Sequence, residues 1–377
     1  MKTALVNARI LTDRDWRTGY ALLIDGTRIA GLCPEATIPD DYAREDLGGG
    51  DLVPGFIDVQ VNGGGGMMLN DATELADLER IAAAHRQFGT TALLPTLITT
   101  SWQRMQEVAA LIRAAIGAGV PGIAGVHFEG PYLNRDRKGV HDARDIRAMD
   151  AGFIEMVSAG DLGAVVVTLA PEVTGPEVIA ALRNAGVIVS AGHSMARYDE
   201  MTAAINAGLT GVTHLYNAMP PMQSREPGLI GAALNSAECY CGFINDGHHV
   251  HPATLKAAIA AKGADKMMLV TDAMATVGTD MTAFRLGDQE IHARDGRLAT
   301  AEGRLAGSAL DMAAAVRNAV TLLDQSLEDA INMASAVPAA FLGQADQRGR
   351  IAPGLAADLV LLEGDMRVKR SWIAGRE

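Results

Sequence analysis

The sequence predicts an α/β protein: a (β/α)8 TIM-like barrel with a small β-sandwich-like domain built from both termini. Three observations lead to this prediction. The chain of 377 residues is longer than a usual single domain, but barrels of this class reach 250 residues and more as one unit. Its centre alternates apolar runs with helical patterns. Its two ends share a β-rich composition.

The β-rich patterns at the two ends come first. Each is a short stretch of apolar and β-branched residues, and the pair Asp25-Gly26 predicts a turn within the N-terminal set. Because the ends of a chain often lie close together, we predict that residues 1–51 and 346–377 form one small domain. The patterns cover residues 4–11, 21–31, 357–362 and 368–373.

Between residues 52 and 345, eight apolar runs are candidate barrel strands. Helical patterns separate them, for example at residues 73–88, 102–118, 196–207 and 252–261. Eight strand–helix units of this kind are typical of a (β/α)8 barrel. A further β-rich piece, residues 284–298, is either a hairpin of the small domain or an insertion near the barrel mouth. The runs are Leu52–Val61, Thr91–Ile98, Ile123–Glu129, Ala164–Ala170, Val187–Ala191, Gly211–Leu215, Cys241–Asn245 and Met267–Thr271.

Composition and charge limit the partners. Hydrophobic residues make up 49% of the chain, which is enough for a large core. The net charge of −13 argues against nucleic acid and against an anionic membrane surface, so a phosphate-bearing substrate would need a local cationic site. The cysteines Cys33, Cys239 and Cys241 form no CxxC pair, and no signal-peptide pattern or long apolar run occurs. We therefore expect a soluble, cytoplasmic protein.

Polar residues gather where the predicted strands end, which in such a barrel is where the active site lies. All but two of the nine histidines, His85 and His292, fall on or just beyond these ends. Taken alone, residues 127–129 also fit a core histidine beside a helix-capping carboxylate. The whole pattern favours a metal hydrolase over scattered structural histidines. The segments are Asp58–Asn62, His127–Glu129, Gly192–Ser194, Thr213–Asn217, Asn245–His249 and Thr271–Asp272.

Glu129, His193 and His214 would form a metal-ligand set. One carboxylate and two neutral imidazoles are normal ligands for catalytic Zn²⁺, with water in the fourth position. Asp272, on the last strand, is placed to take the proton of that water and pass it to a leaving group. The alternative is that Asp272 caps the following helix. His141, on the loop after the third strand, would polarise a substrate carbonyl, unless it is merely solvated.

Five motifs resemble those of the N-acetylglucosamine-6-phosphate deacetylase family, which belongs to the amidohydrolase superfamily. The resemblance runs over nearly the whole chain. The first motif is shared across the superfamily, whereas the second and the fourth are much more specific. The motifs are Pro54–Asp58, His127–Pro131, Gly192–Ser194, Thr213–Met219 and Thr271–Ala273.

The resemblance implies hydrolysis of N-acetyl-D-glucosamine 6-phosphate to D-glucosamine 6-phosphate and acetate, in amino-sugar catabolism and cell-wall sugar recycling. It implies the same three ligands, with Asp272 as general base and acid and His141 as the residue that contacts and polarises the substrate carbonyl. It also implies a homodimer with a phosphate contact donated across the interface. The positions that match the family's sugar-phosphate site are Asn217, Ala218, Arg225 and His249.

One departure from the superfamily bears on the number of metals. Many members carry His-x-His at the end of the first strand, which supplies a second metal site, but Gln60 and Asn62 stand there in this chain. Amides are poor ligands for divalent transition metals compared with imidazole, so we predict one divalent metal per subunit. Zn²⁺ is favoured, and Fe²⁺ or Co²⁺ also suits the ligands. His127 is expected to support the site, whereas His248 and His251 have no assigned role.

Three alternatives stay open. The substrate could be N-acetylgalactosamine 6-phosphate, which differs at one hydroxyl. A cyclic-amide hydrolase of the same superfamily is less favoured, because it would usually need the missing His-x-His pair. A catalytically silent barrel that acts as a binding subunit is opposed by the presence of all three ligands and of Asp272.

Overall fold

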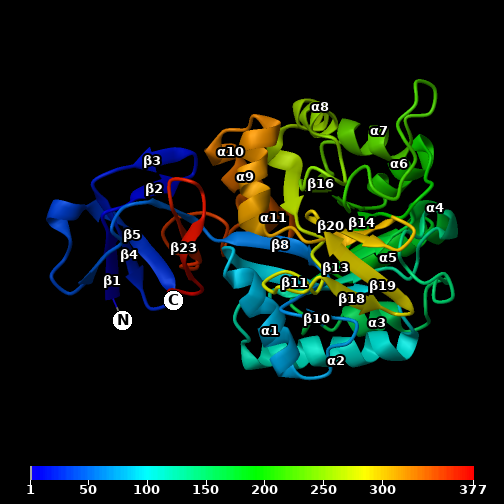
Figure 1. The fold of residues 1–377 in the computed structure, drawn as a ribbon, viewed down its shortest axis with the longest axis horizontal. Coiled ribbons are helices and arrows are strands. Elements are labelled where there is room, and N and C mark those ends of the chain that lie inside the picture. The colour runs from blue at the N-terminus through cyan, green and yellow to red at the C-terminus, as the bar shows by residue number, and fades with distance from the viewer. Residues whose placement is uncertain (1) are drawn as a thin grey trace.

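The structure, a computed structural model, describes residues 2–377 and contains two bodies (Figure 1). A small β domain, drawn in blue and red, stands at one end of the molecule. The barrel forms the rest, and the helices drawn in orange lie on the side of the barrel that faces the small domain. No helix in residues 2–377 has the length and apolar character needed to cross a membrane.

Eight parallel strands form the barrel and pair in chain order. The Asp272 amide donates to the Gln60 carbonyl at 3.0 Å and the Asn62 amide to the Ala273 carbonyl at 2.9 Å, so the first and last strands meet. The predicted barrel is therefore confirmed. The strands are β8 (Phe56–Val61), β11 (Thr90–Ile98), β12 (Gly125–Glu129), β13 (Ala164–Leu169), β14 (Ile188–Ala191), β15 (Gly211–Val212), β16 (Tyr240–Ile244) and β17 (Met267–Val270).

Several predicted runs exceed the strands that form by one or two residues, and two exceed them by more. The run Leu52–Val61 is divided at Gly55, and its first part belongs to the small domain. A Cβ atom at Gly55 would lie 2.1 Å from the Thr91 hydroxyl, so only glycine fits this crossing point. The run Gly211–Leu215 ends early, because His214 turns the chain with a φ of 33°.

Helices surround the barrel, and the four helical patterns are confirmed. The second of them shows why its ends lie where they do: the Ser101 side chain accepts from the Arg104 amide, and Gly119 ends the helix with a φ of 66°. The helices are α1 (Leu75–Arg86), α2 (Trp102–Ala118), α3 (Phe153–Val157), α4 (Pro171–Thr174), α5 (Pro176–Asn184), α6 (Tyr198–Asn206), α7 (Gly228–Asn235), α8 (Pro252–Lys262), α9 (Met312–Leu323), α10 (Leu327–Ala334) and α11 (Ala336–Phe341), with 3-10 turns η1 (Glu35–Thr37), η2 (Arg135–Arg137) and η3 (Ala264–Lys266).

The small domain consists of two sheets, and both chain ends contribute to it. In the second sheet, Val360 near the C-terminus pairs with Val53. Leucine and isoleucine side chains of both sheets share one core. The first sheet has β5 (Arg28–Pro34), β4 (Tyr20–Asp25), β1 (Lys2–Val6) and β6 (Ala43–Asp46); the second has β23 (Val368–Trp372), β22 (Leu359–Leu362), β7 (Asp51–Pro54), β2 (Arg9–Thr12) and β3 (Asp15–Arg17).

The predicted N-terminal strand over residues 4–11 is two strands, one in each sheet. Asn7 separates them with a φ of 58°, a left-handed conformation that asparagine tolerates better than most residues. The Asp25-Gly26 turn is confirmed, since Asp25 pairs with Arg28 across it. The domain boundaries at residues 51 and 346 stay a prediction.

A four-stranded antiparallel sheet follows the last barrel strand and lies at the barrel mouth, not in the small domain. Its apolar side packs on Met274 and Ile98, which come from loops and strands of the barrel. Of the two predicted places for residues 284–298, the insertion near the mouth is therefore correct. The strands are β18 (Ala283–Leu286), β19 (Gln289–Arg294), β20 (Arg297–Thr300) and β21 (Leu305–Ser308), and a short hairpin, β9 (Gly63–Gly64) and β10 (Met67–Met68), lies beside α1.

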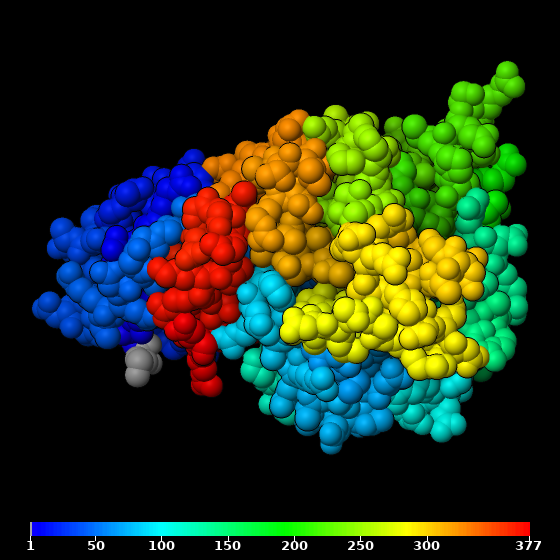
Figure 2. Space-filling model, viewed as in Figure 1, coloured from blue at the N-terminus to red at the C-terminus, as the bar shows by residue number. Residues whose placement is uncertain are grey.

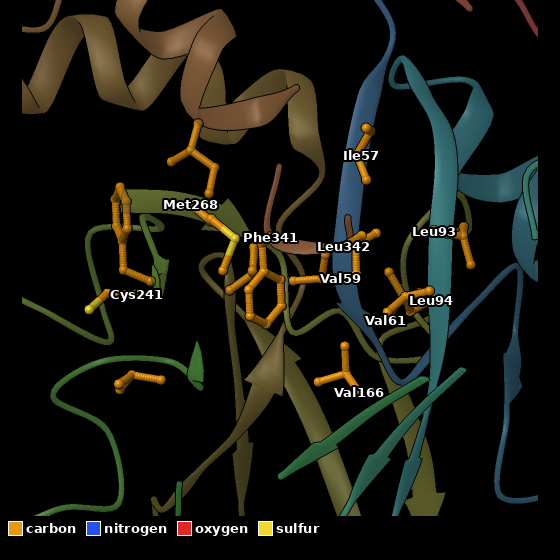
Figure 3. Packing of buried hydrophobic residues seen from close by; sticks show 14 of the residues in the cluster. Ile57, Val59, Val61, Leu93, Leu94, Val166, Cys241, Met268, Phe341 and Leu342 are labelled. Carbon is orange, nitrogen blue, oxygen red and sulfur yellow. The ribbon is translucent and has the colours of Figure 1, made fainter. Parts of the chain in front are cut away.

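The interior of the barrel is filled by side chains of the strands and of one helix. Figure 3 shows the Phe341 ring, from α11, between Met268 and Val59 of two barrel strands. These three residues line one small internal space with His127. The packed interior leaves the strand ends as the place for a site.

Candidate metal centre and active site

Three side chains from three strand ends converge on one point. Glu129 ends β12, His193 follows β14, and His214 follows β15. Glu129 Oε1 lies 3.2 Å from His193 Nε2 and 3.0 Å from His214 Nε2, and the two Nε2 atoms are 3.1 Å apart. All three residues are buried, and their ligand atoms form a group that could hold a metal ion.

The tautomer of one histidine shows that this group fits a cation. His193 Nδ1 lies 2.8 Å from the Arg137 carbonyl, which can only accept, so Nδ1 carries the hydrogen. A neutral His193 therefore directs a lone pair from Nε2 at Glu129. A carboxylate and imidazole lone pairs at this separation repel one another unless a cation lies between them. Such a donor set is normal for a divalent transition metal.

The pKa values at this point reflect the same crowding. Burial alone would raise the pKa of Glu129, but the neighbouring His193 and His214 outweigh it and hold this pKa well below its usual range. Burial alone would lower the pKa of His214, yet the contact with the Glu129 carboxylate raises it above its ordinary value. The site therefore presents an ionised carboxylate beside imidazoles.

The backbone aims these side chains into the barrel mouth. His193, His214 and Asp272 have φ values of 49°, 33° and 51°. Residues other than glycine rarely adopt this left-handed conformation, which costs of order 1 kcal/mol or more each. Each of these strands thus ends in a sharp turn at its functional residue.

Asp272 lies beside the ligand group and is held by two amides. Its Oδ1 accepts from Asn62 Nδ2 at 2.7 Å and from Gln60 Nε2 at 3.1 Å, and the same Gln60 nitrogen lies 3.2 Å from Glu129 Oε1. Burial and the charge of Glu129 raise the pKa of Asp272 to about 6. The alternative that Asp272 caps the next helix is wrong, because Asp311 caps that helix, α9.

His141 is buried rather than solvated, so that alternative is also wrong. Its side chain lies in the loop after β12, its ring centre is 4.3 Å from that of His193, and its Nδ1 is 2.7 Å from Thr99 Oγ1. Burial, followed by the nearby His193, holds the pKa of His141 well below its ordinary value. A neutral imidazole therefore stands next to the ligand group.

These residues share a cavity of about 520 Å³ with part of the predicted phosphate site. Asn217, Ala218 and His249 line it, and His249 Nδ1 donates to Asp246 Oδ2 at 2.7 Å. Arg225 is not in this cavity. Arg225 belongs to the exposed residues 221–225, which lie between β15 and α7. These residues form a segment that projects from the barrel surface (Figure 2).

Some lining residues have no recognisable signal in the sequence. Arg304, in the turn between β20 and β21 of the sheet at the barrel mouth (the mouth sheet), lines the cavity and donates to the Gly139 carbonyl at 3.0 Å. The stretch Arg135–Lys138 lines the same wall. Their positions depend on how the loop after β12 and the insertion after β17 fold over the mouth, which no local pattern reveals.

The remaining histidines lie outside the ligand group. His127 is buried below the centre, with Nδ1 3.1 Å from the Val59 carbonyl and Nε2 2.7 Å from Thr168 Oγ1. His127 therefore links β12, the strand that ends in Glu129, to β8 and β13. His251 caps α8, accepting from the Ala253 amide, and His248 is exposed.

A closed α/β barrel with a Glu-His-His group and a buried aspartate at its mouth defines a metal-dependent hydrolase of the amidohydrolase type. Comparison with known proteins agrees: the model of the amidohydrolase family matches residues 52–377, and that of the NagA composite domain matches residues 3–52. The chain belongs to the amidohydrolase family and, within it, to the N-acetylglucosamine-6-phosphate deacetylases and their galactosamine counterparts.

The relatives match over most of their length. An N-acetylgalactosamine-6-phosphate deacetylase of Shewanella sp. (strain ANA-3) is 45% identical, over 98% of this chain and 94% of that protein. An N-acetylglucosamine-6-phosphate deacetylase of Haemophilus influenzae is 33% identical, over 100% and 99%. The crystal structure of N-acetylglucosamine-6-phosphate deacetylase from Pasteurella multocida superimposes with a TM-score of 0.96 at 35% identity, covering 100% of this chain and 99% of that one.

Proposed function

We propose that this chain hydrolyses the acetamide of N-acetyl-D-glucosamine 6-phosphate to D-glucosamine 6-phosphate and acetate, in amino-sugar catabolism and cell-wall sugar recycling. One observation carries the proposal: the Glu-His-His group, Asp272, His141 and His249 line a single cavity. The names of the relatives point to the same substrate class. Three free cysteines suit the cytoplasm, where we propose that the protein acts.

Glu129, His193 and His214 would hold one divalent metal, and Zn²⁺ suits their one-carboxylate, two-imidazole set best. Fe²⁺ and Co²⁺ also fit these ligands. When bound, such a metal supplies a Lewis acid and lowers the pKa of a water molecule at this position. Gln60 and Asn62 turn their amide N–H groups towards Asp272, so they act as donors and not as ligands of a second metal.

Asp272 would transfer the proton from the water to the leaving amine. Its Oδ1 is occupied by two amide donors, which leaves Oδ2 to take a proton from the attacking water. The same oxygen then returns the proton to the nitrogen of the departing amine, whose C–N bond breaks. His141 donates a hydrogen bond to the carbonyl oxygen and stabilises the negative charge that develops there.

The phosphate would lie at the other end of the cavity. Asn217, Ala218 and His249 line that wall, and the hydrogen bond to Asp246 orients the His249 ring. We propose that Arg225 completes the site of a neighbouring subunit in a homodimer. Two features support this: Arg225 is exposed on a projecting segment, and Met222 on the same segment is 57% exposed, as expected for an apolar contact with a partner.

The second candidate substrate is N-acetylgalactosamine 6-phosphate. The observation that favours it is the 45% identity with the Shewanella enzyme of that name, against 33% with the Haemophilus glucosamine enzyme. The two sugars differ only in the orientation of one hydroxyl, so both fit the same metal, carbonyl and phosphate contacts.

The test is acetate release from the two epimers by protein that has been stripped of metal and titrated with Zn²⁺. We expect activity that returns, saturates near one equivalent per chain and is higher with the gluco substrate. A higher kcat/KM with the galacto substrate would show that N-acetylgalactosamine 6-phosphate is the preferred substrate, and the proposed reaction would still be deacetylation. No release from either sugar at any metal loading would contradict the deacetylase and favour a silent barrel.

A further inference from the structure

The second barrel strand ends beside the active site in a residue that has no role in the proposed reaction. Thr99 follows β11, and only 7% of its surface is exposed. Its hydroxyl oxygen lies 2.7 Å from Nδ1 of His141, which is itself 3% exposed. Both groups are therefore shielded from water, so the direction of this hydrogen bond decides which nitrogen of His141 carries the hydrogen.

The proposed role of His141 permits only one direction. A carbonyl oxygen accepts hydrogen bonds, so His141 must present an N–H to it. Nδ1 already faces Thr99, which leaves Nε2 for the substrate. A neutral imidazole carries a single N–H, so a hydrogen on Nε2 requires a lone pair on Nδ1. The Thr99 hydroxyl must then be the donor.

The surroundings of Thr99 leave its hydroxyl free to donate in this way. Among residues 2–377, the other acceptor near it is the Glu129 carbonyl, at 3.4 Å, and that carbonyl already accepts from the Thr99 amide at 3.0 Å. His141 Nδ1 is the closer partner, at 2.7 Å. Gly130 makes room for the hydroxyl, since a Cβ atom there would lie 2.3 Å from it.

We propose that Thr99 is a positioning residue that donates its hydroxyl hydrogen to Nδ1 of His141 and so fixes the tautomer with the hydrogen on Nε2. The inference rests on the proposed function, because it assumes that His141 polarises the substrate carbonyl. Without the hydroxyl, His141 would also populate the tautomer with the hydrogen on Nδ1, whose Nε2 lone pair repels a carbonyl oxygen.

Thr99→Val removes the hydroxyl at nearly constant shape, and Thr99→Ser keeps it. We expect Thr99→Val to lower kcat by about 10- to 100-fold, with KM and Zn²⁺ content close to wild type, because it weakens one donor to the developing oxyanion. Thr99→Ser should stay within about threefold. Thr100→Val, at the neighbouring half-buried position, is the matched control for a threonine-to-valine change, because the hydrogen bond to His141 Nδ1 involves Thr99 and not Thr100.

A double-mutant cycle separates an action through His141 from a general structural effect. In a His141→Ala background, Thr99→Val should cause no further loss of kcat. Nitrogen-15 spectra of the histidine rings in the wild-type protein should show His141 with its hydrogen on Nε2, and this signature should weaken in Thr99→Val.

An equal loss of kcat in both backgrounds would overturn the inference, and so would a Thr99→Val variant within twofold of wild type. A hydrogen found on Nδ1 of His141 in the wild-type protein would also overturn it. None of these outcomes bears on the proposed deacetylase function. That proposal would be contradicted by the absence of acetate release by the wild-type protein. The ring spectra test the tautomer even in that case.

Discussion

At the scale of single residues, the two oxygens of the Asp272 carboxylate have different roles. Two buried amides hold Oδ1, and among residues 2–377 Oδ2 has no hydrogen-bond partner. The Asp272 side chain reaches the cavity, so Oδ2 is the oxygen that a water molecule can meet. The anchored oxygen gives orientation, and the other one carries the proton.

Replacing Asp272 with asparagine keeps the shape of the side chain and removes the proton acceptor. We expect Asp272→Asn to lose about 1,000-fold or more in kcat, because proton transfer and the protonation of the departing amine both fail. Zn²⁺ content, measured by elemental analysis, should stay at the wild-type level, since Asp272 is not among the three ligands. Activity within tenfold of wild type would show that another group moves the proton.

At the scale of elements, Gln60 and Asn62 determine what the end of β8 can do. Both side chains are buried, and both donate a hydrogen bond to Asp272 instead of offering a ligand to a metal. We expect the double variant Gln60→His/Asn62→His to bind a second Zn²⁺ per chain, because imidazole is a far better ligand than an amide. Metal titration followed by elemental analysis measures this. Saturation near one equivalent would mean that the end of β8 cannot bring two imidazoles to a common ion.

The seam between β8 and β17 contains a second buried carboxylate, Asp58. Its Oδ2 accepts from the Thr271 hydroxyl at 2.5 Å, so it joins the first and last strands of the barrel. Burial raises its pKa from 3.8 to about 7. The folded state therefore prefers the protonated form, and the stability that this preference contributes is complete below the unfolded pKa and is lost as pH rises through about 7.

The variant Asp58→Asn removes this pH dependence. From about pH 4 to pH 7 the wild-type free energy of unfolding should lose a contribution, of at most about 1.4 kcal/mol per pH unit, that the variant does not lose. The difference in Tm, variant minus wild type, should therefore shift in favour of Asp58→Asn as pH rises. The exposed residue Asp346, changed to asparagine, is the control. A difference in Tm that does not change with pH would contradict the prediction.

At the scale of the whole molecule, the sequence predicts what depends on the order of the chain. Apolar runs that end in Glu129, His193 or Asp272 place these residues at strand ends, and barrel topology then brings the ends together. The sequence does not predict contacts made by segments that fold back over the barrel mouth. Thr99 is a single threonine after a strand, and nothing in the sequence marks its contact with His141. Arg304 reaches the cavity only because the mouth sheet folds over the cavity. The sequence does not show the breaks at Asn7 and Gly55, because each depends on a neighbouring strand or sheet rather than on the local pattern.

Arg225 raises the question of how many chains make one active site. The residue is exposed on the projecting segment, whereas its proposed ligand, the phosphate, would lie in the cavity near His249. If a partner supplies the guanidinium, Arg225→Ala should raise KM for the phosphorylated sugar by about 10- to 100-fold, the value of a lost charge-assisted contact. Acetate release as a function of substrate concentration measures this.

Mixed dimers show which chain the guanidinium serves. A chain with Arg225→Ala keeps its Asp272, and a chain with Asp272→Asn keeps its Arg225. Co-expressed with two different tags and purified as the mixed species, the pair should recover a wild-type KM in about half of the sites, because the inactive chain lends Arg225 to the active one. The control pairs Arg225→Ala with the double variant Arg225→Ala/Asp272→Asn and should recover nothing. Equal KM values for the two pairs would place Arg225 outside the partner's site and leave the phosphate to His249, Asn217 and Ala218.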